Sequence, residues 1–532
     1  MRTTVISHFC AVGLFVLAGV AWGKEAVWMG TTSRDWSAAD NWDNGGYPPA
    51  AVGNQGVEFN AAAPNQPIVA GDVPAAGSKQ LSAITFKTAG WTLGGSGSVT
   101  VSRANLQGVT DLLNPIPHVK SSGAGENIIS VPLKLVKPNS GNTQFVATPG
   151  NTLTLGHVSF VNDATSNFDL TGGGTFHVTD VVSCGDFRIG NGSLVLLDCK
   201  DGVNPLPKSS KVRVVGATLR WLKSNQACQG TNPITYLRID GNGLADINGQ
   251  NETFQQIQFA LDTTEAGVIE TGTGKLTLSA GTVSVGSSSK IPASTAVIRG
   301  TLAKSGGGGF TFQTRRGTQE SDLVLDCAIN DASSCFFQGV PDVDPGRVVM
   351  KGVYTANGKF QVSGGALRLE NPGVNVFAGA EFNVNAGARL EGAAILRGVL
   401  NNSKMLTIKG VLSPGMTSGG LQIVESTLAN GTKVMMPVVF KSGSTFEIPC
   451  LSEGVTNLST EGGVTVEDGV TIDFSKIVDS SAGTFHLLHA EAGISGVFQA
   501  AGLPDGWTYT VDPNGKDLWL KVPQKGLEVI VR

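Results

Sequence analysis

The stretch from Gly358 to Leu421 reads GKFQVSGGALRLENPGVNVFAGAEFNVNAGARLEGAAILRGVLNNSKMLTIKGVLSPGMTSGGL. Short runs of alternating apolar and polar residues are separated by Gly or Asn, and no run has the spacing of a helix. Because successive side chains of a strand point to opposite sides, one set of apolar residues can share one face of several short strands. This set comprises Phe360, Val362, Leu367, Leu369, Phe382, Val384, Leu406 and Ile408.

The same pattern occurs at two earlier places in the chain. Residues 185–196 read GDFRIGNGSLVL, and residues 274–285 read GKLTLSAGTVSV. Each copy is typical of two short strands joined by a turn at Gly, a residue that tolerates a positive φ. Such a unit cannot bury its apolar face alone, so repetition favours a stack of coils. We therefore predict an all-β solenoid, with a β-sandwich built from ordinary hairpins as the alternative.

The first residues have the features of a secretory signal peptide. A charged start at Arg2 precedes an apolar run from Phe9 to Val20, which is followed by small residues before Lys24. The run is shorter than the roughly 20 residues that span a bilayer, so a signal peptide over residues 1–23 is favoured over a membrane helix. We expect an exported protein, located at the cell surface, outside the cell or in the periplasm, with no membrane-spanning segment after removal of the signal.

The remaining sequence divides into three parts. Residues 24–60 are rich in Trp and are predicted to form an N-terminal cap, and residues 61–425 are predicted to form the solenoid body. Residues 426–532 are predicted to form a C-terminal β-rich cap or small β domain. Its segment WTYTVDPNGKDLWLKV has a turn signal from Asp512 to Gly515 between two alternating runs, which predicts a terminal hairpin.

Composition limits the classes of function. The chain has 532 residues, a formal net charge of −4 and only 15% charged residues, and it contains 71 Gly. Average Gly usage is only about 7%, so this composition is typical of a turn-dense β protein. Lys and Arg are scattered, so we expect no nucleic-acid partner. No nucleotide-binding, GxSxG or HExxH motif occurs, and we predict no cofactor.

Cysteine spacing favours disulfide bonds. Seven cysteines are present, and Cys10 lies in the predicted signal peptide, which leaves an even number in an exported chain. Cys327 with Cys335 is the first predicted pair, and Cys184 with Cys199 is the second. None of the spacings is the CxxC of a zinc or redox site, so structural disulfides are the preferred interpretation.

The densest charged segment reads RRGTQESDLVLDC and spans Arg315 to Cys327. Asp322 and Asp326 are an even number of residues apart, which places them on one face of an unbroken strand. Leu323 and Leu325 would then point inward, and both aspartates would point into solvent. A solvent-facing charge cluster is therefore favoured over a catalytic or binding groove, where glycoside hydrolysis would need two carboxylates across one bond.

Two histidines lie close together near the C-terminus. His486 and His489 are three residues apart in a predicted strand, and this spacing places their side chains on opposite faces. They are therefore predicted to be poor joint ligands of a metal ion. The other histidines are isolated in the sequence, and we predict no metal site.

Three aromatic residues gather near the predicted mature start, namely Trp28, Trp36 and Trp42. Exposed rings could stack on sugars, with neighbouring Asp side chains as hydrogen-bonding partners, which would make this a glycan contact site. Buried rings could instead close the open end of the stack, since each Trp buries a large apolar area.

Two segments resemble autotransporter-associated β-strand repeat proteins. The first is the mature start, where the matching residues are Trp28, Gly30, Trp36, Asn41, Trp42, Gly45 and Pro48. The second lies in the opening stretch, where they are Asn385, Gly387, Leu390, Gly392, Gly398, Asn402, Gly410, Leu412, Pro414 and Gly415. The resemblance implies a right-handed parallel β-helix exported by a bacterium with an outer membrane. Because the same motif opens these solenoids generally, it favours capping by the Trp cluster over glycan contact.

The tail departs from this family. It shows no series of alternating strands of about ten residues, as a translocating barrel would. We therefore expect a passenger-like body without its own transporter. The leading functional hypothesis is a non-enzymatic scaffold with a structural or adhesive role, whose partners would be surface polysaccharide or other cell-surface proteins. A β-helix polysaccharide lyase or hydrolase and a carbohydrate-binding module are the alternatives.

Overall fold

The computed structural model describes residues 26–43, 56–60, 64–73, 81–102, 117–136, 143–161, 166–200, 204–206, 211–229, 232–332, 334–340, 342–356, 358–378, 381–398, 405–415, 419–427, 431, 433–477 and 481–524. The predicted signal peptide lies outside the described residues and stays a prediction. No helix in the described part of the chain is long and apolar enough to cross a bilayer.

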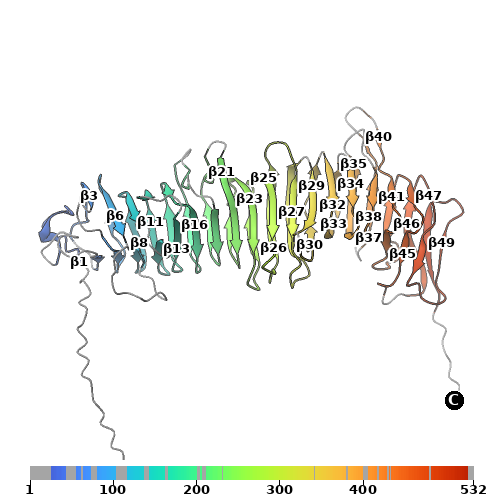
Figure 1. Cartoon of the computed structure of the whole chain (residues 1–532), viewed down its shortest axis with the longest axis horizontal. Coiled ribbons are helices and arrows are strands. Elements are labelled where there is room, and N and C mark those ends of the chain that lie inside the picture. The colour runs from blue at the N-terminus through green and yellow to red at the C-terminus, as the bar shows by residue number, and fades with distance from the viewer. Residues whose placement is uncertain are drawn as a thin grey trace, which may run out of the picture.

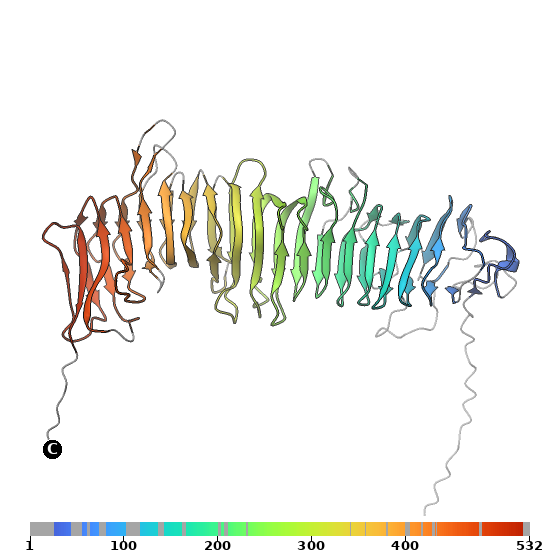
Figure 2. The same ribbon diagram turned by 180° about the vertical axis from the view of Figure 1, so that it is seen from behind.

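Short parallel strands stack coil upon coil along one long axis (Figures 1 and 2). The colours follow the sequence along this axis, so neighbouring coils in space are neighbours in the chain. Nearly all pairings between described strands are parallel, which a β-sandwich of hairpins would not give. The predicted all-β parallel solenoid is thus confirmed.

Two sides of the solenoid are continuous ladders. The first contains β1 (Ala26–Val27), β2 (Val57–Phe59), β4 (Ile84–Phe86), β7 (Val119–Ser121), β10 (Thr143–Ala147), β13 (Asn167–Thr171), β16 (Asp186–Gly190), β18 (Lys211–Val215), β21 (Asn232–Asp240), β23 (Asn251–Ala260), β25 (Lys275–Val285), β27 (Phe310–Thr314), β29 (Cys335–Gly339), β32 (Lys359–Val362), β34 (Glu381–Val384), β36 (Leu406–Ile408), β41 (Val438–Phe440), β44 (Val464–Val466) and β47 (Ile494–Ser495). The second contains β5 (Thr92–Leu93), β8 (Gly125–Ile129), β11 (Asn151–Leu155), β14 (Thr175–Val178), β17 (Leu194–Leu197), β19 (Thr218–Trp221), β22 (Leu244–Asp246), β24 (Gly267–Glu270), β26 (Ala296–Lys304), β28 (Leu323–Ala332), β30 (Arg347–Met350), β33 (Gly365–Ala378), β35 (Ala388–Gly398), β37 (Val411–Pro414), β42 (Thr445–Glu447), β45 (Thr471–Asp473) and β48 (Gln499–Ala501).

The third side has two separate ladders. The N-terminal one contains β3 (Asp72–Val73), β6 (Ser98–Ser102), β9 (Leu133–Val136), β12 (Val158–Phe160) and β15 (Val182–Ser183). The C-terminal one uses one part of each of β21, β23, β25, β26, β28, β33 and β35, together with β31 (Tyr354–Ala356), β38 (Leu421–Val424), β43 (Leu458–Thr460) and β46 (Gly483–Ala490). The remaining elements are η1 (Ala39–Asn41), β20 (Cys228–Gln229), β39 (Ser426–Thr427), β40 (Lys433–Val434), β49 (Thr508–Val511) and β50 (Asp517–Val522).

The core is a column of stacked side chains inside the coils. Phe312, Phe337, Phe360 and Phe382 follow one another along the first ladder, with ring centroids 5.1, 5.2 and 4.3 Å apart. The eight apolar residues that the opening stretch was predicted to place on one face are all buried. Period-2 alternation therefore identified the inward positions correctly.

The parallel stacking continues past residue 425, where the C-terminal part was predicted to begin, because β41, β44 and β47 continue the first ladder. At the C-terminal end, β50 pairs antiparallel with both β46 and β49. The predicted hairpin around Asp512–Gly515 is thus confirmed. The Asp512 carboxylate accepts hydrogen bonds from the backbone N–H groups of Lys516 and Asp517, which fixes the turn.

Neither predicted disulfide is formed in this structure. Cys199, Cys327 and Cys335 have free thiols, so Cys184 is not bonded to Cys199. Cys327 lies in β28, where it is paired in register with Gly300. Cys335 lies in β29 of the first ladder, where it is paired with Phe310. The two cysteines are close in sequence but lie on different strands. Burial raises the pKa of the Cys335 thiol to about 12, which makes it an unreactive core side chain.

Hydrogen-bonding side chains fill the interruption of the third side. Among the described residues, no strand pairing joins β15 to β21, and the side chains of Gln226 and Glu252 occupy this region, each 1% exposed. The Gln226 side chain accepts the N–H of Cys199 (3.2 Å) and donates to its carbonyl oxygen (3.1 Å). The Glu252 carboxylate accepts the N–H groups of Gln226 (3.0 Å) and Ala227 (2.8 Å). These contacts replace the backbone bonds that a strand would supply.

Replacing a ring in the aromatic column should destabilise the fold. Phe360→Ala removes a side chain that stacks between two others, which is expected to cost about 3–5 kcal/mol of unfolding free energy. Gln361→Ala shortens the half-exposed neighbour in the same strand and should change stability by no more than about 0.5 kcal/mol. Urea unfolding of both variants measures the difference. Equal losses would show that the column does not carry the stability of these coils.

Glu252 should make stability depend on pH. Burial raises its pKa from 4.5 to about 8, although the two backbone N–H groups act in the opposite direction. The folded chain therefore holds this proton more tightly than the unfolded chain, and the resulting stability is complete below about pH 4.5 and is lost as the pH rises through about 8. Each tenfold difference in proton affinity between the two states corresponds to about 1.4 kcal/mol. Urea unfolding from about pH 5 to about pH 9 should show this loss in the wild type and not in Glu252→Gln. Identical pH profiles would contradict the assignment.

Candidate functional site

The N-terminal Trp cluster is a packed cap. Trp28, Trp36 and Trp42 are 2%, 1% and 3% exposed. The centroid of the Trp42 ring lies 5.0 Å from that of Trp28 and 4.8 Å from that of Trp36, and Trp36 in turn contacts Phe59 of β2. Sugar stacking needs an exposed ring face, whereas these rings cover one another and the first coils. Their burial favours the capping role, and glycan contact by these three residues stays an untested prediction.

A buried Asn holds the loop that carries this cap. The Asn41 side-chain oxygen accepts the N–H groups of Thr32 (3.0 Å) and Ser33 (3.1 Å). Its amide nitrogen donates to the hydroxyl of Ser33 and to the carbonyl of Asp35, both at 2.9 Å. Asn41 is completely buried, so it saturates the backbone groups of the loop and fixes the rings against the end of the stack.

The prediction that Asp322 and Asp326 share the solvated face is wrong for Asp322, which is 1% exposed. Asp326 is exposed as predicted. The strand β28 begins at Leu323, so strand alternation does not extend back to Asp322, and Asp322 and Leu323 are both buried. The Asp322 carboxylate accepts the N–H groups of Gly317 and Arg347, both at 2.7 Å, and burial raises its pKa.

Ion pairs connect arginines of the second ladder to carboxylates of the same strand and of other coils. Arg368 lies 2.8 Å from Glu320 and 3.0 Å from Glu370, measured between nitrogen and oxygen. Arg389 pairs with Glu391 at 2.8 Å and also with Glu447, which is nearly buried. The charges neutralise one another across successive coils, so this cluster is better explained by structural pairing than by catalysis.

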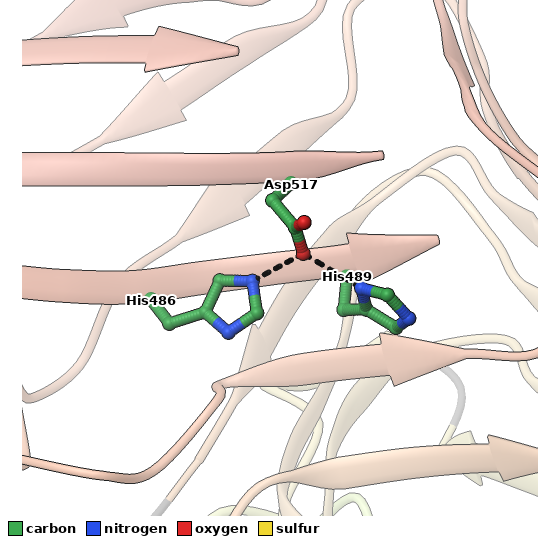
Figure 3. A group of neighbouring side chains, drawn as sticks. All are labelled: His486, His489 and Asp517. Atoms are coloured by element: carbon green, nitrogen blue, oxygen red, sulfur yellow. Dashed lines mark hydrogen bonds and ion pairs between the residues drawn. The ribbon is translucent and has the colours of Figure 1, made fainter. Parts of the chain in front are cut away.

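The two histidines near the C-terminus lie on the same face, so the prediction that they point to opposite faces is wrong. The register between β46 and β50 shifts between His486 and Leu488. Leu487 and Leu488 are both buried, which shows that the strand contains an extra residue at this point. Such a bulge moves the following side chain to the other face. His486 and His489 therefore both meet Asp517 of β50 (Figure 3).

The geometry of this group brings three potential metal ligands together. Asp517 Oδ1 lies 2.7 Å from His486 Nε2 and 2.6 Å from His489 Nδ1. The three ligand atoms all lie within 4.8 Å of one another, and the three residues are half-buried. A donor set of two imidazoles and one carboxylate suits Zn²⁺ and related transition metals. The prediction of no joint ligand site is therefore not supported by the arrangement of these side chains.

Sequence reasoning missed Asp517 altogether. It follows the predicted turn, but the hairpin alone pairs β50 with β49 and not with β46, the strand that carries the histidines. The bulge could have been suspected from the adjacent Leu487 and Leu488, since two successive large apolar residues break strict alternation. The sequence could not tell which strand β50 would pair with.

No family model, curated protein or solved structure matches the chain. The resemblance to autotransporter-associated β-strand repeat proteins is therefore a prediction from the quoted motifs. What the fold defines is the class of protein, a parallel β-solenoid.

Asp322 should matter for stability whereas Asp326 should not. Asp322→Ala leaves the partly buried N–H groups of Gly317 and Arg347 without this acceptor, which is expected to cost about 2–4 kcal/mol of unfolding free energy. Asp326→Ala changes only an exposed side chain and is expected to stay within about 0.5 kcal/mol. Urea unfolding of the two variants, each compared with wild type, is the measurement. A stable Asp322→Ala variant would contradict the structural role of this carboxylate.

Proposed function

We propose that this chain is an exported, non-enzymatic β-solenoid scaffold with a structural or adhesive role at the cell surface or outside the cell. Its partners would be surface polysaccharide or other cell-surface proteins. The resemblance of the mature start and of the opening stretch to autotransporter-associated β-strand repeat proteins supports this proposal. The features of a signal peptide support export.

The observation that carries the proposal is a lateral row of uncharged polar side chains along the first ladder. From β23 to β47 the outward positions alternate with buried residues and are mostly amides or hydroxyls, namely Gln256, Gln258, Thr282, Ser284, Thr311, Gln313, Gln338, Gln361, Asn383, Thr407, Thr465 and Ser495. The exceptions are Phe336, Val439 and the ion pair of Lys359 with Glu381. Neighbouring strands of a sheet lie roughly 4.7–4.9 Å apart, so these groups recur at about that spacing along the solenoid. A long series of hydrogen-bonding groups suits extended contact with another surface.

The alternative is a polysaccharide lyase or hydrolase, or a carbohydrate-binding module. Glycoside hydrolysis needs two carboxylates that are free to reach one glycosidic bond. The carboxylates of Asp322, Glu252 and Glu447 are instead bound to backbone N–H groups or to Arg389. Burial raises the pKa of Asp322 and of Glu252, whose carboxylates are held in these structural contacts. These contacts favour the scaffold over the enzyme.

Adding charge to the lateral row should weaken contact with the cell surface without unfolding the chain. The variant Gln313→Lys/Asn383→Lys alters two outward positions of the first ladder. We expect the purified variant to bind whole producing cells and their isolated envelope polysaccharide at least about tenfold more weakly, since two polar contacts in the binding face are replaced by hydrated charges. The retained protein is quantified after washing.

The matched control is Thr277→Lys/Gln422→Lys, which adds the same charge to outward positions of the third side. It should bind as the wild type does. Equal losses of binding in both double variants would contradict the assignment of the binding face to the first ladder. Release of sugar fragments from the polysaccharide by the wild type would favour the enzyme instead.

A further inference from the structure

We propose that His486, His489 and Asp517 bind one divalent transition-metal ion of the Zn²⁺ type, which joins the C-terminal hairpin to the last coils. Two ligands come from β46, and the third comes from β50 (Figure 3). An ion at this point would link two strands that are separated in sequence by the whole of β47, β48 and β49. The proposal concerns the stability of the chain's end and stands independently of the surface role.

The contacts of Asp517 identify the place of the ion. One carboxylate oxygen, Oδ1, accepts hydrogen bonds from both imidazole rings, at 2.7 and 2.6 Å. Two ring nitrogens thus point at a single oxygen, and a cation among the three atoms would replace the two ring protons. Zn²⁺ bonds to His nitrogen and to carboxylate oxygen at about 2.0–2.2 Å, so ligand atoms within 4.8 Å of one another need only small side-chain movements to coordinate it.

The opposite nitrogen of each ring already has an outer partner. His486 Nδ1 lies 2.9 Å from the Thr456 hydroxyl, and His489 Nε2 lies 3.4 Å from a carboxylate oxygen of Glu491. When one ring nitrogen binds a metal, the other carries a proton and donates it to such a partner. Hydroxyl, carbonyl or carboxylate partners of this kind orient the histidines of metal sites and raise their basicity.

The rings are also held in position and can be reached from solvent. The His486 ring stacks on Trp519, with centroids 4.1 Å apart and an interplanar angle of 12°. The His486, His489 and Asp517 side chains are 21%, 34% and 23% exposed, so an ion has an entry path and water can supply a fourth ligand. Three protein ligands with one water ligand is a common coordination for Zn²⁺.

A second His–Asp pair in the chain provides the comparison. His177 Nε2 lies 3.1 Å from Asp198, at similar exposure. Asp198 is also bound by Lys223 at 3.1 Å, so a cation already neutralises it, and only one imidazole is present. The C-terminal group differs because it combines two imidazoles with one shared oxygen. A single His–Asp contact is therefore not sufficient for the proposed metal site.

The test uses the full chain after removal of metal with a chelator. Titration calorimetry with Zn²⁺ is expected to show one site per chain at micromolar concentrations, with Ca²⁺ and Mg²⁺ binding far more weakly because they prefer oxygen ligands. His489→Gln and Asp517→Asn should each weaken Zn²⁺ binding at least about tenfold. His177→Gln is the matched control and should leave the affinity unchanged.

Fluorescence locates the ion independently of affinity. Cu²⁺, which quenches nearby Trp emission, should reduce the emission of the wild type by a component that Trp519→Phe lacks. If an inner-ligand variant fails to fold, Thr456→Val replaces an outer partner with a residue of similar shape and should weaken Zn²⁺ binding about tenfold. Three results would overturn the proposal: no saturable Zn²⁺ binding, unchanged binding in both His489→Gln and Asp517→Asn, or equal Cu²⁺ quenching in the wild type and in Trp519→Phe.

Discussion

Hydrogen bonding between successive coils is the constraint on which the rest of the structure depends. Each short strand, such as β32, obtains its backbone partners from the coil before and the coil after it. The same register keeps Phe360 between Phe337 and Phe382. A shift of one residue would turn the apolar set outward, so pairing and core packing specify each other. No coil can satisfy both needs alone, which is why stability in such a stack comes from neighbours.

This dependence explains why charged and polar residues lie inside the solenoid. Where a ladder is interrupted or a strand has not yet begun, backbone N–H groups still need acceptors and backbone carbonyl groups still need donors. Glu252 supplies acceptors beside Gln226, Asp322 supplies them before β28, and Asn457 donates to the carbonyl of Pro414 at 3.2 Å. A perturbed pKa often marks a catalytic group, but burial alone raises the pKa of Glu252 and of Asp322, against the opposite effect of their backbone hydrogen bonds. These buried carboxylates therefore have a structural role in the solenoid.

The sequence predicted those features that depend on strict alternation, and it failed where alternation breaks. The inward residues of the opening stretch and the terminal hairpin follow from period-2 patterns and turn residues. Asp322 lies just outside its strand, and the bulge at Leu487–Leu488 reverses the face of His489. Asp517 comes from a distant strand, whose pairing is decided by how the last coil is closed. The disulfide predictions failed because they relied on closeness in sequence, and a coil places residues that are close in sequence on different sides of the solenoid.

The two ends of the solenoid solve the problem of closure by different means. At the N-terminal end, three Trp rings bury large apolar area, and the loop that carries them is saturated by Asn41. At the C-terminal end, antiparallel strands complete the third ladder, and half-exposed polar side chains cross between β46 and β50. Apolar side chains offer no ligands to a metal ion, whereas imidazole and carboxylate groups do. Ends are where a stack opens first and where exposed strand edges invite aggregation. The C-terminal closure is thus the part of the fold where a bound ion would have the greatest effect on the whole.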